Sequence, residues 1–171
     1  MTEPRLPEPW LRGTLTDVAA VPRAVLHALE LAKEDLLRWC GGLNDQELNA
    51  RPDGIASVAF HIRHIARSFD RLLSYAAGEP LNNEQIAALK TELDADATRA
   101  DLFSELEAAV ERSAARIRRL DADRLGDARV VGLKRLPTTV GGLLVHVADH
   151  TQRHVGQAIT TAKIVTARRG G

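Results

Sequence analysis

Four long segments of the chain carry apolar residues with the period of an α-helix. We expect helices over residues 20–40, 57–77, 98–120 and about 137–166. Apolar side chains recur there every three or four residues, which places them on one face of a helix with about 3.6 residues per turn. Strand patterns do not alternate with these segments, so a Rossmann or barrel fold is not expected. The pattern predicts an all-α four-helix bundle.

The apolar faces define the expected core, and the second helix also has a distinct basic face. Arg63, Arg67 and Arg71 lie opposite its apolar stripe. The residues expected to face the core of the first three helices are Val21, Val25, Leu29, Ala32, Leu36 and Trp39, then Val58, Ile62, Ile65, Phe69, Leu72 and Ala76, then Leu102, Leu106, Ala109, Ser113, Ile117 and Leu120. Each face repeats along one side of its helix, as packing in a bundle requires.

Start and stop signals support these boundaries. Ser57 is suited to cap the second helix and Gly78 to end it. Within LNNEQIAALK, Asn82 and Gln85 have the spacing of a capping box, so a short additional helix is expected.

Long connections are expected on both sides of the third helix. The segment DADRLGDARVVGLKRLPTTV, before the last helix, contains scattered glycine, proline and charge. We interpret it as an ordered connection with a few extended residues at ARVVGL, and Pro137 to Thr139 as the start of the last helix. Both connections are long enough to cross the bundle. Residues 1–171 are expected to form one domain, with residues 1–15 as an N-terminal extension.

Composition narrows the class of partner. Lys plus Arg and Asp plus Glu each total 23, which gives a formal net charge of zero. A nucleic-acid or membrane-surface binder needs a basic excess, so neither partner is expected. The single cysteine, Cys40, is interpreted as a small core residue and fits a reducing compartment. The N-terminus lacks signal-peptide character and apolar runs fall short of a membrane span, so a cytoplasmic location is expected.

Five of the six histidines fall in two of the expected helices. His150 and His154 are four residues apart, so they lie one above the other on a helix and can approach one cation together. A cation needs a third ligand, and the second helix offers His61 and His64. The alternative is that these histidines are half-buried structural residues that form hydrogen bonds. His146 lies at the edge of the stripe.

The motifs SVAFHIRHIA and HTQRHVGQ resemble those of the DinB-like superfamily, which includes YfiT-like metal-dependent proteins and thiol transferases. The resemblance covers most of the chain and implies a four-helix bundle with a divalent cation held by three histidines. Matched onto this sequence, the implied ligands are His64, His150 and His154, followed by Gly156 and Gln157. Val155 stands where the family usually has arginine, which weakens any inference about anionic substrates.

Helical periodicity alone favours His61 over His64, because His61 lies nearer the apolar stripe. The family match favours His64, so His64 is the predicted ligand and His61 its alternative. We expect His61, His146, Gln157 and Tyr75 to be outer-shell or pocket residues; Gln157 follows His154 by about one turn.

Three imidazoles leave a coordination position open, as in catalytic zinc sites. Imidazole ligands suit zinc or nickel, and the sequence does not choose between them. By resemblance, the leading hypothesis is a metal-dependent enzyme that acts on a small molecule, with transfer to a low-molecular-weight thiol ahead of hydrolysis. The alternative is a metal-binding or interaction bundle without catalysis. No catalytic residue is assigned, and a homodimer is expected from the resemblance.

Overall fold

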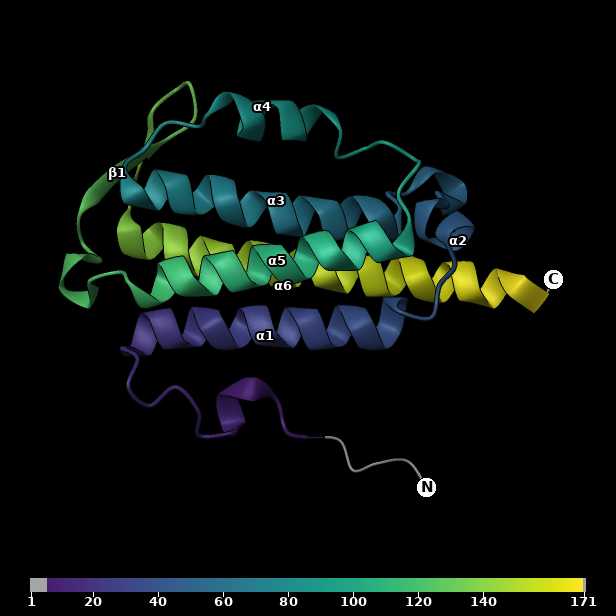
Figure 1. Ribbon diagram of the computed structural model, residues 1–171, viewed down its shortest axis with the longest axis horizontal. Helices are drawn as coiled ribbons and strands as arrows, with labels where there is room; N and C mark the ends of the chain where they lie inside the picture. Colours follow the sequence, from purple (N-terminus) through teal and green to yellow (C-terminus); the bar gives the residue numbers. More distant parts are fainter. Residues whose placement is uncertain (1–5, 171) are drawn as a thin grey trace.

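Four long helices lie side by side along one axis, and the expected four-helix bundle is confirmed (Figure 1). They are α1 (Ala20–Cys40), α3 (Val58–Ala77), α5 (Arg99–Arg118) and α6 (Val140–Ala167). The computed structural model describes residues 6–170, so the first five residues of the predicted N-terminal extension lie outside the described residues. Within residues 6–170, every helix is too short or too polar to cross a lipid bilayer.

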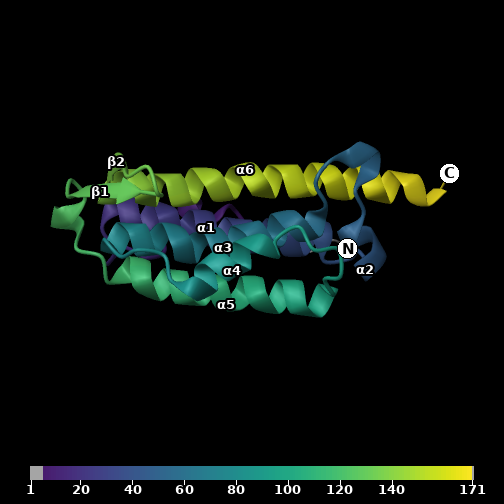
Figure 2. The same ribbon diagram turned by 90° about the horizontal axis from the view of Figure 1, so that it is seen from above.

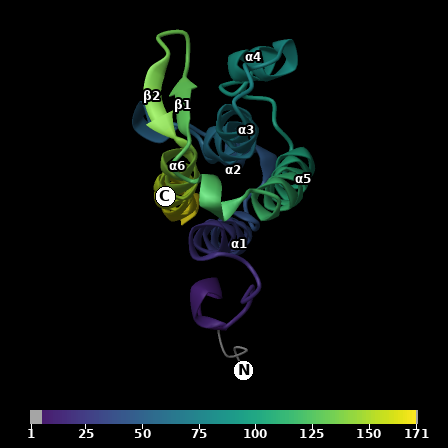
Figure 3. The same cartoon turned by 90° about the vertical axis from the view of Figure 1, so that its left-hand side faces the viewer.

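The four helices occupy the corners of a square. Helix α6 packs between α1 and α3 on one side, and α5 packs between the same two helices on the other (Figure 3). Helices α3 and α6 run antiparallel, whereas α3 and α5 run parallel (Figure 1). A parallel pair of consecutive helices needs a connection that travels the length of the bundle. Residues 78–98 form this crossover, and its helix α4 (Asn83–Lys90) lies outside α3.

Two elements differ from the sequence-based expectation. Helix α2 (Asp45–Asn49) was not expected, although Asn44 and Glu47 form a complete capping box at its start. Strand β1 (Ala128–Val131) confirms the extended residues expected at ARVVGL, and it pairs with the unexpected strand β2 (Leu136–Thr139) in an antiparallel hairpin before α6. The prediction that Pro137 to Thr139 begin the last helix is therefore wrong. Thr139 ends β2 and caps α6 by accepting a hydrogen bond from the Gly142 N–H at 3.0 Å.

The remaining elements are single 3-10 turns, which are η1 (Pro9–Leu11), η2 (Pro52–Gly54), η3 (Ala122–Arg124) and η4 (Arg168–Gly170). The turn η1 lies on the outer side of α1 (Figure 3). Arg12 fixes this segment by pairing with Glu30 at 3.0 Å and with Glu34 at 2.7 Å.

The predicted core is largely confirmed. The apolar stripes of α1, α3 and α5 form one buried cluster with α6, and Cys40 belongs to it. The capping boxes and caps at Ser57, Gly78 and Asn82 also form as expected. Trp39 is the exception, because 41% of its surface is exposed. Its ring instead lies under the Lys163 ammonium, 4.5 Å from the ring centroid, where a cation–π contact stabilises it.

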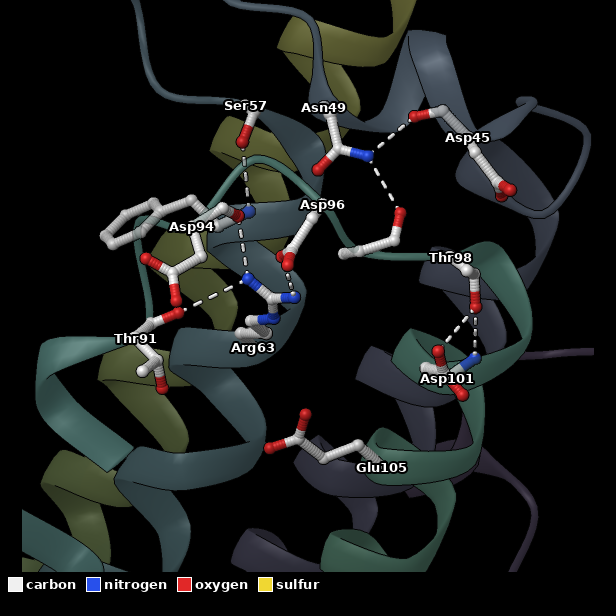
Figure 4. A network of polar contacts seen from close by, with 12 residues as sticks. Asp45, Asn49, Ser57, Arg63, Thr91, Asp94, Asp96, Thr98, Asp101 and Glu105 are labelled. Carbon is white, nitrogen blue, oxygen red and sulfur yellow. Dashed lines mark hydrogen bonds and ion pairs between the residues drawn. The ribbon is translucent and has the colours of Figure 1, made fainter. Parts of the chain in front are cut away.

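The basic face of α3 holds the crossover segment. Arg63 donates to the Thr91 carbonyl at 3.3 Å and to the Asp94 carbonyl at 2.7 Å, as Figure 4 shows. One turn later, Arg67 donates to the Ala88 carbonyl at 2.8 Å. These arginines thus satisfy backbone carbonyls that would otherwise need solvent.

The last arginine and α2 complete this attachment. Arg71 forms a buried ion pair with Glu92 at 2.6 Å. On the α2 side, Asn49 donates to the Ala97 carbonyl at 2.8 Å (Figure 4). The crossover is therefore fastened to both α3 and α2, and Glu92 is held facing α3.

Removal of the Arg63 guanidinium is expected to loosen the crossover without unfolding the bundle. In Arg63→Ala, the amides of residues 91–98 should exchange with deuterium roughly tenfold faster, because two charge-assisted bonds to the backbone are lost. Hydrogen–deuterium exchange read by mass spectrometry measures this. Arg118→Ala, at an exposed position of α5, is the matched control. Equal exchange of residues 91–98 in both variants would contradict the attachment.

Candidate metal centre

The antiparallel contact between α3 and α6 brings four histidines together. Figure 2 shows α6 running along the length of α3. His64 and His150 approach with their Nε2 atoms 3.1 Å apart, and His61 and His154 with their Nδ1 atoms 3.0 Å apart. The ring centroids of His64 and His154 are 4.4 Å apart. Two residues from each helix thus form one histidine cluster.

Three of these histidines are placed to share one cation. His64, His150 and His154 each offer one ring nitrogen, and these nitrogens lie within 4.8 Å of one another. Bonds of about 2.0–2.1 Å in a tetrahedral zinc site separate the ligand nitrogens by roughly 3.4 Å. The spacing therefore fits a cation after small side-chain adjustments. The structure brings together the same three residues as the family resemblance, and His64 rather than His61 is in the set.

The remaining nitrogen of each candidate ligand has a partner. His64 Nδ1 lies 2.7 Å from the Glu92 carboxylate, and His154 Nδ1 lies against His61. His150 Nδ1 faces the Ser68 hydroxyl at 3.5 Å, the longest of these contacts. Such partners fix the tautomer and the ring orientation of a metal-binding histidine. In all three residues Nδ1 is engaged, so Nε2 is the nitrogen available to a cation.

Glu92 is the member of the site that sequence reasoning missed. It comes from the crossover rather than from a long helix, and only 5% of its surface is exposed. Burial alone would raise the pKa of its carboxyl group, but hydrogen bonds from His64 and Arg71 outweigh burial and lower that pKa. Glu92 is therefore ionised and bound on both sides. The acid is remote in sequence from both histidine pairs, so no local spacing pointed to it.

Burial keeps three of the four cluster histidines uncharged. Desolvation, together with the charges of neighbouring histidines, lowers the pKa of His150 and of His154 from 6.5 to about 4. The same causes lower the pKa of His61 to about 4. These imidazoles are neutral at pH 7, which is the form that binds metals.

The other predicted site residues lie at different distances from the cluster. His61 is 4% exposed and contacts His154 rather than joining the three candidate ligands. His146 is exposed, its ring 5.4 Å from that of His150 and its Nδ1 3.8 Å from the Asp149 carboxylate. Gln157 is exposed and lines a groove beside His154. At about 1.5 Å of rise per residue, Tyr75 lies roughly 16 Å along α3 from His64, which is too far to touch the cluster.

Phe60 is a second residue that the sequence analysis did not single out. Its ring stacks on His64 with centroids 5.3 Å apart and meets His61 edge-on at 5.1 Å. An aromatic ring in this position shields the imidazoles from water and restricts their rotation. It also lines the groove that contains Gln157.

The metal-free protein is expected to lose stability as the pH falls from 6.5 to 4.5. His61, His150 and His154 bind protons in the unfolded chain near pH 6.5 but in the folded protein only near pH 4. Between these values the unfolded state binds more protons, so acid favours unfolding. Urea unfolding in a chelator, at several pH values, gives the free energy of unfolding.

One variant separates the cluster from other titrating groups. His61→Leu removes one titrating imidazole, so its stability should depend less steeply on pH between 6.5 and 4.5. Carboxylates with lowered pKa values change their protonation mainly below pH 4.5, so they affect the pH dependence of stability mainly below this window. A free energy of unfolding that stays constant across it in the wild type would contradict the buried, neutral cluster.

Comparison with known proteins identifies the family and relatives with the same fold. The sequence profile of the DinB superfamily matches residues 28–158. Among curated proteins, no sequence matches the chain significantly. The crystal structure of a conserved protein from Enterococcus faecalis is 24% identical, with a TM-score of 0.72, and the match covers 88% of this chain and 99% of that one.

A second solved structure shares the fold at lower identity. YfiT from Bacillus subtilis is 17% identical, with a TM-score of 0.62, and 87% of each chain is covered. It is described as a probable metal-dependent hydrolase with an unusual four-helix bundle topology. The matched profile begins within α1, ends within α6 and includes all four residues of the histidine cluster. The chain belongs to the DinB superfamily.

Proposed function

We propose that the chain is a divalent-metal-dependent enzyme that acts on a small molecule, with His64, His150 and His154 as the metal ligands. The observation that carries this proposal is the convergence of three ring nitrogens within 4.8 Å. A purely structural role for these residues would require no such convergence, because each imidazole could form its hydrogen bonds separately.

The donor set fits zinc or nickel. Both ions accept imidazole nitrogen, and His150 and His154 are neutral at pH 7. A cation held by three protein ligands keeps an open coordination position, acts as a Lewis acid and lowers the pKa of a water or thiol that binds to it.

The surrounding residues would keep the ligands in place. Glu92 accepts the Nδ1 proton of His64 and thereby directs Nε2 toward the ion, while Arg71 holds the Glu92 carboxylate on its other side. His61 likewise accepts the Nδ1 proton of His154 and directs its Nε2 toward the ion. Phe60 covers the rings of His61 and His64. These contacts restrict the imidazoles before any ion binds, which raises metal affinity.

Transfer to a low-molecular-weight thiol is the leading reaction. Hydrolysis of an amide or ester usually uses a free general base near the metal. The nearest buried carboxylate, Glu92, is engaged by both His64 and Arg71. In the transfer, the thiol would release its proton to solvent water and its sulfur would form a bond to an electrophilic carbon. The bond between that carbon and the leaving group would break, and the leaving group would take the electron pair. This reaction needs no separate carboxylate base.

Hydrolysis is the second candidate, and the description of the Bacillus subtilis structure as a probable metal-dependent hydrolase favours it. An assay of the zinc-loaded and nickel-loaded protein against thiols paired with electrophiles, and against esters and amides, separates the two reactions. Metal binding without turnover in either assay would favour a non-catalytic metal-binding bundle. Two copies of the chain are still expected to form a dimer, which light scattering can measure.

Loss of one ligand is expected to reduce metal affinity sharply. The wild type should bind one divalent ion per chain, and His150→Ala or His154→Ala should weaken binding at least about 100-fold, because two imidazoles hold an ion far less tightly than three. Glu92→Gln should weaken binding about 10- to 100-fold through the orientation of His64. Competition with a chromogenic chelator gives these affinities.

The matched control is His146→Ala, which removes an exposed histidine of the same helix. It should bind the ion like the wild type. Wild-type affinity in both His150→Ala and His154→Ala would reject the metal site, and wild-type affinity in Glu92→Gln alone would reject only the orienting role of Glu92.

A further inference from the structure

A groove opens beside the histidine cluster, between α6 and the start of α3. It has a volume of about 580 Å³ and is open to solvent. Its walls include Ile55, Phe60, His61, His154, Gly156 and Gln157. Because His154 belongs to both the groove and the set of candidate metal ligands, a molecule lying in the groove would reach the candidate metal site.

The wall formed by α3 and the residues before it is apolar. Ile55 is 42% exposed, and the half-buried Phe60 continues this surface inward. A single exposed isoleucine is common on protein surfaces. Here it shares a wall with an aromatic ring that stacks directly on His64. The apolar surface therefore leads to the imidazoles.

Gly156 leaves the α6 side of the groove open. It lies in the middle of a 28-residue helix, where glycine destabilises the helix relative to alanine. A Cβ atom added there would meet no other atom within 4 Å. Packing within the chain therefore does not require glycine at this position. A missing side chain two residues from His154 instead allows a ligand to lie close to the backbone.

The polar groups that line the groove are mostly engaged within the protein. Arg153 pairs with Asp149 at 2.6 Å, which balances the charge at the rim. Thr160 donates to the Gly156 carbonyl at 2.9 Å, and Thr161 donates to the Ala56 carbonyl at 3.2 Å. The groove itself thus favours an uncharged body. A divalent cation bound to three neutral imidazoles would instead leave positive charge at the inner end, which favours an anionic group.

We infer that the groove binds the uncharged apolar body of the substrate, an aryl or branched alkyl group, while an anionic group of the same molecule reaches the histidine cluster. This inference rests on the metal site proposed above. It assigns substrate selection to Ile55, Phe60 and Gly156, which are separate from the three candidate metal ligands.

The test compares two hydroxamates that share one anionic, metal-binding group. Acetohydroxamate carries a methyl group and benzohydroxamate a phenyl ring. In calorimetric titration of the zinc-loaded protein, benzohydroxamate should bind about tenfold tighter, because the phenyl ring buries more apolar area. Metal analysis after the titration shows that zinc has stayed on the protein.

Gly156→Leu should abolish this preference. Leucine favours helix, so the melting temperature should not fall, yet its side chain fills the groove and the ratio of the two affinities should approach one. Val145→Leu is the matched control, because it places leucine at an exposed position of the same helix outside the groove. It should keep the wild-type ratio.

The outcomes separate the two proposals. Absence of both zinc and nickel binding in the wild type would overturn the proposed function, and this inference with it. Zinc binding with equal affinities for the two hydroxamates, or with a ratio that Gly156→Leu leaves unchanged, would overturn the groove assignment alone.

Discussion

The packing of α6 against α3 is the contact on which the rest of the molecule depends. Ile62 and Ile65 of α3 and Val147 and Val155 of α6 are buried in the common core, and they hold the helices in register. The same register places histidines of both helices at the same level of the bundle. Burying imidazoles costs free energy unless their nitrogens find partners. The cluster meets this requirement because each ring contacts another ring, a carboxylate or a hydroxyl.

The parallel arrangement of α3 and α5 has a direct consequence for the site. It requires a connection along the outside of α3, and that connection delivers Glu92 to His64. The crossover has few core residues of its own, so polar contacts from α3 must hold it in place. Arg63, Arg67 and Arg71 provide these contacts over successive turns. A face that would otherwise be exposed to solvent thus becomes the support for a buried carboxylate.

The site combines a rigid part and an open part. The histidine cluster is enclosed by the core and by Phe60, whereas the groove beside it is open to solvent. Such a division suits the proposed function, in which the histidines hold an ion and the groove admits a small molecule. The low identity to the two solved structures, together with the high coverage, shows that the bundle tolerates extensive sequence change. Any specificity of this chain would then reside in groove residues such as Ile55 and Gly156.

The sequence by itself determined the four helices, most of the core and the likeness of its histidine motifs to one family. These features are local, since helical period and capping depend on residues three or four apart. Helix α2 and strand β2 escaped prediction because they are short and their signals are weak. The exposure of Trp39 escaped prediction because a helical wheel shows the direction of a side chain, but not whether a neighbouring helix covers that position.

Only the tertiary structure decided which histidine of α3 joins His150 and His154. Helical periodicity favoured His61, but α6 contacts the flank of α3 on which His64 lies. His64 therefore joins the three candidate ligands, and His61 contacts the Nδ1 atom of His154 instead. The tertiary structure also decided the position of Glu92, the burial of Arg71 and the placement of Phe60. These contacts join residues far apart in sequence, and their geometry follows from helix direction and crossover path, which short-range patterns do not encode.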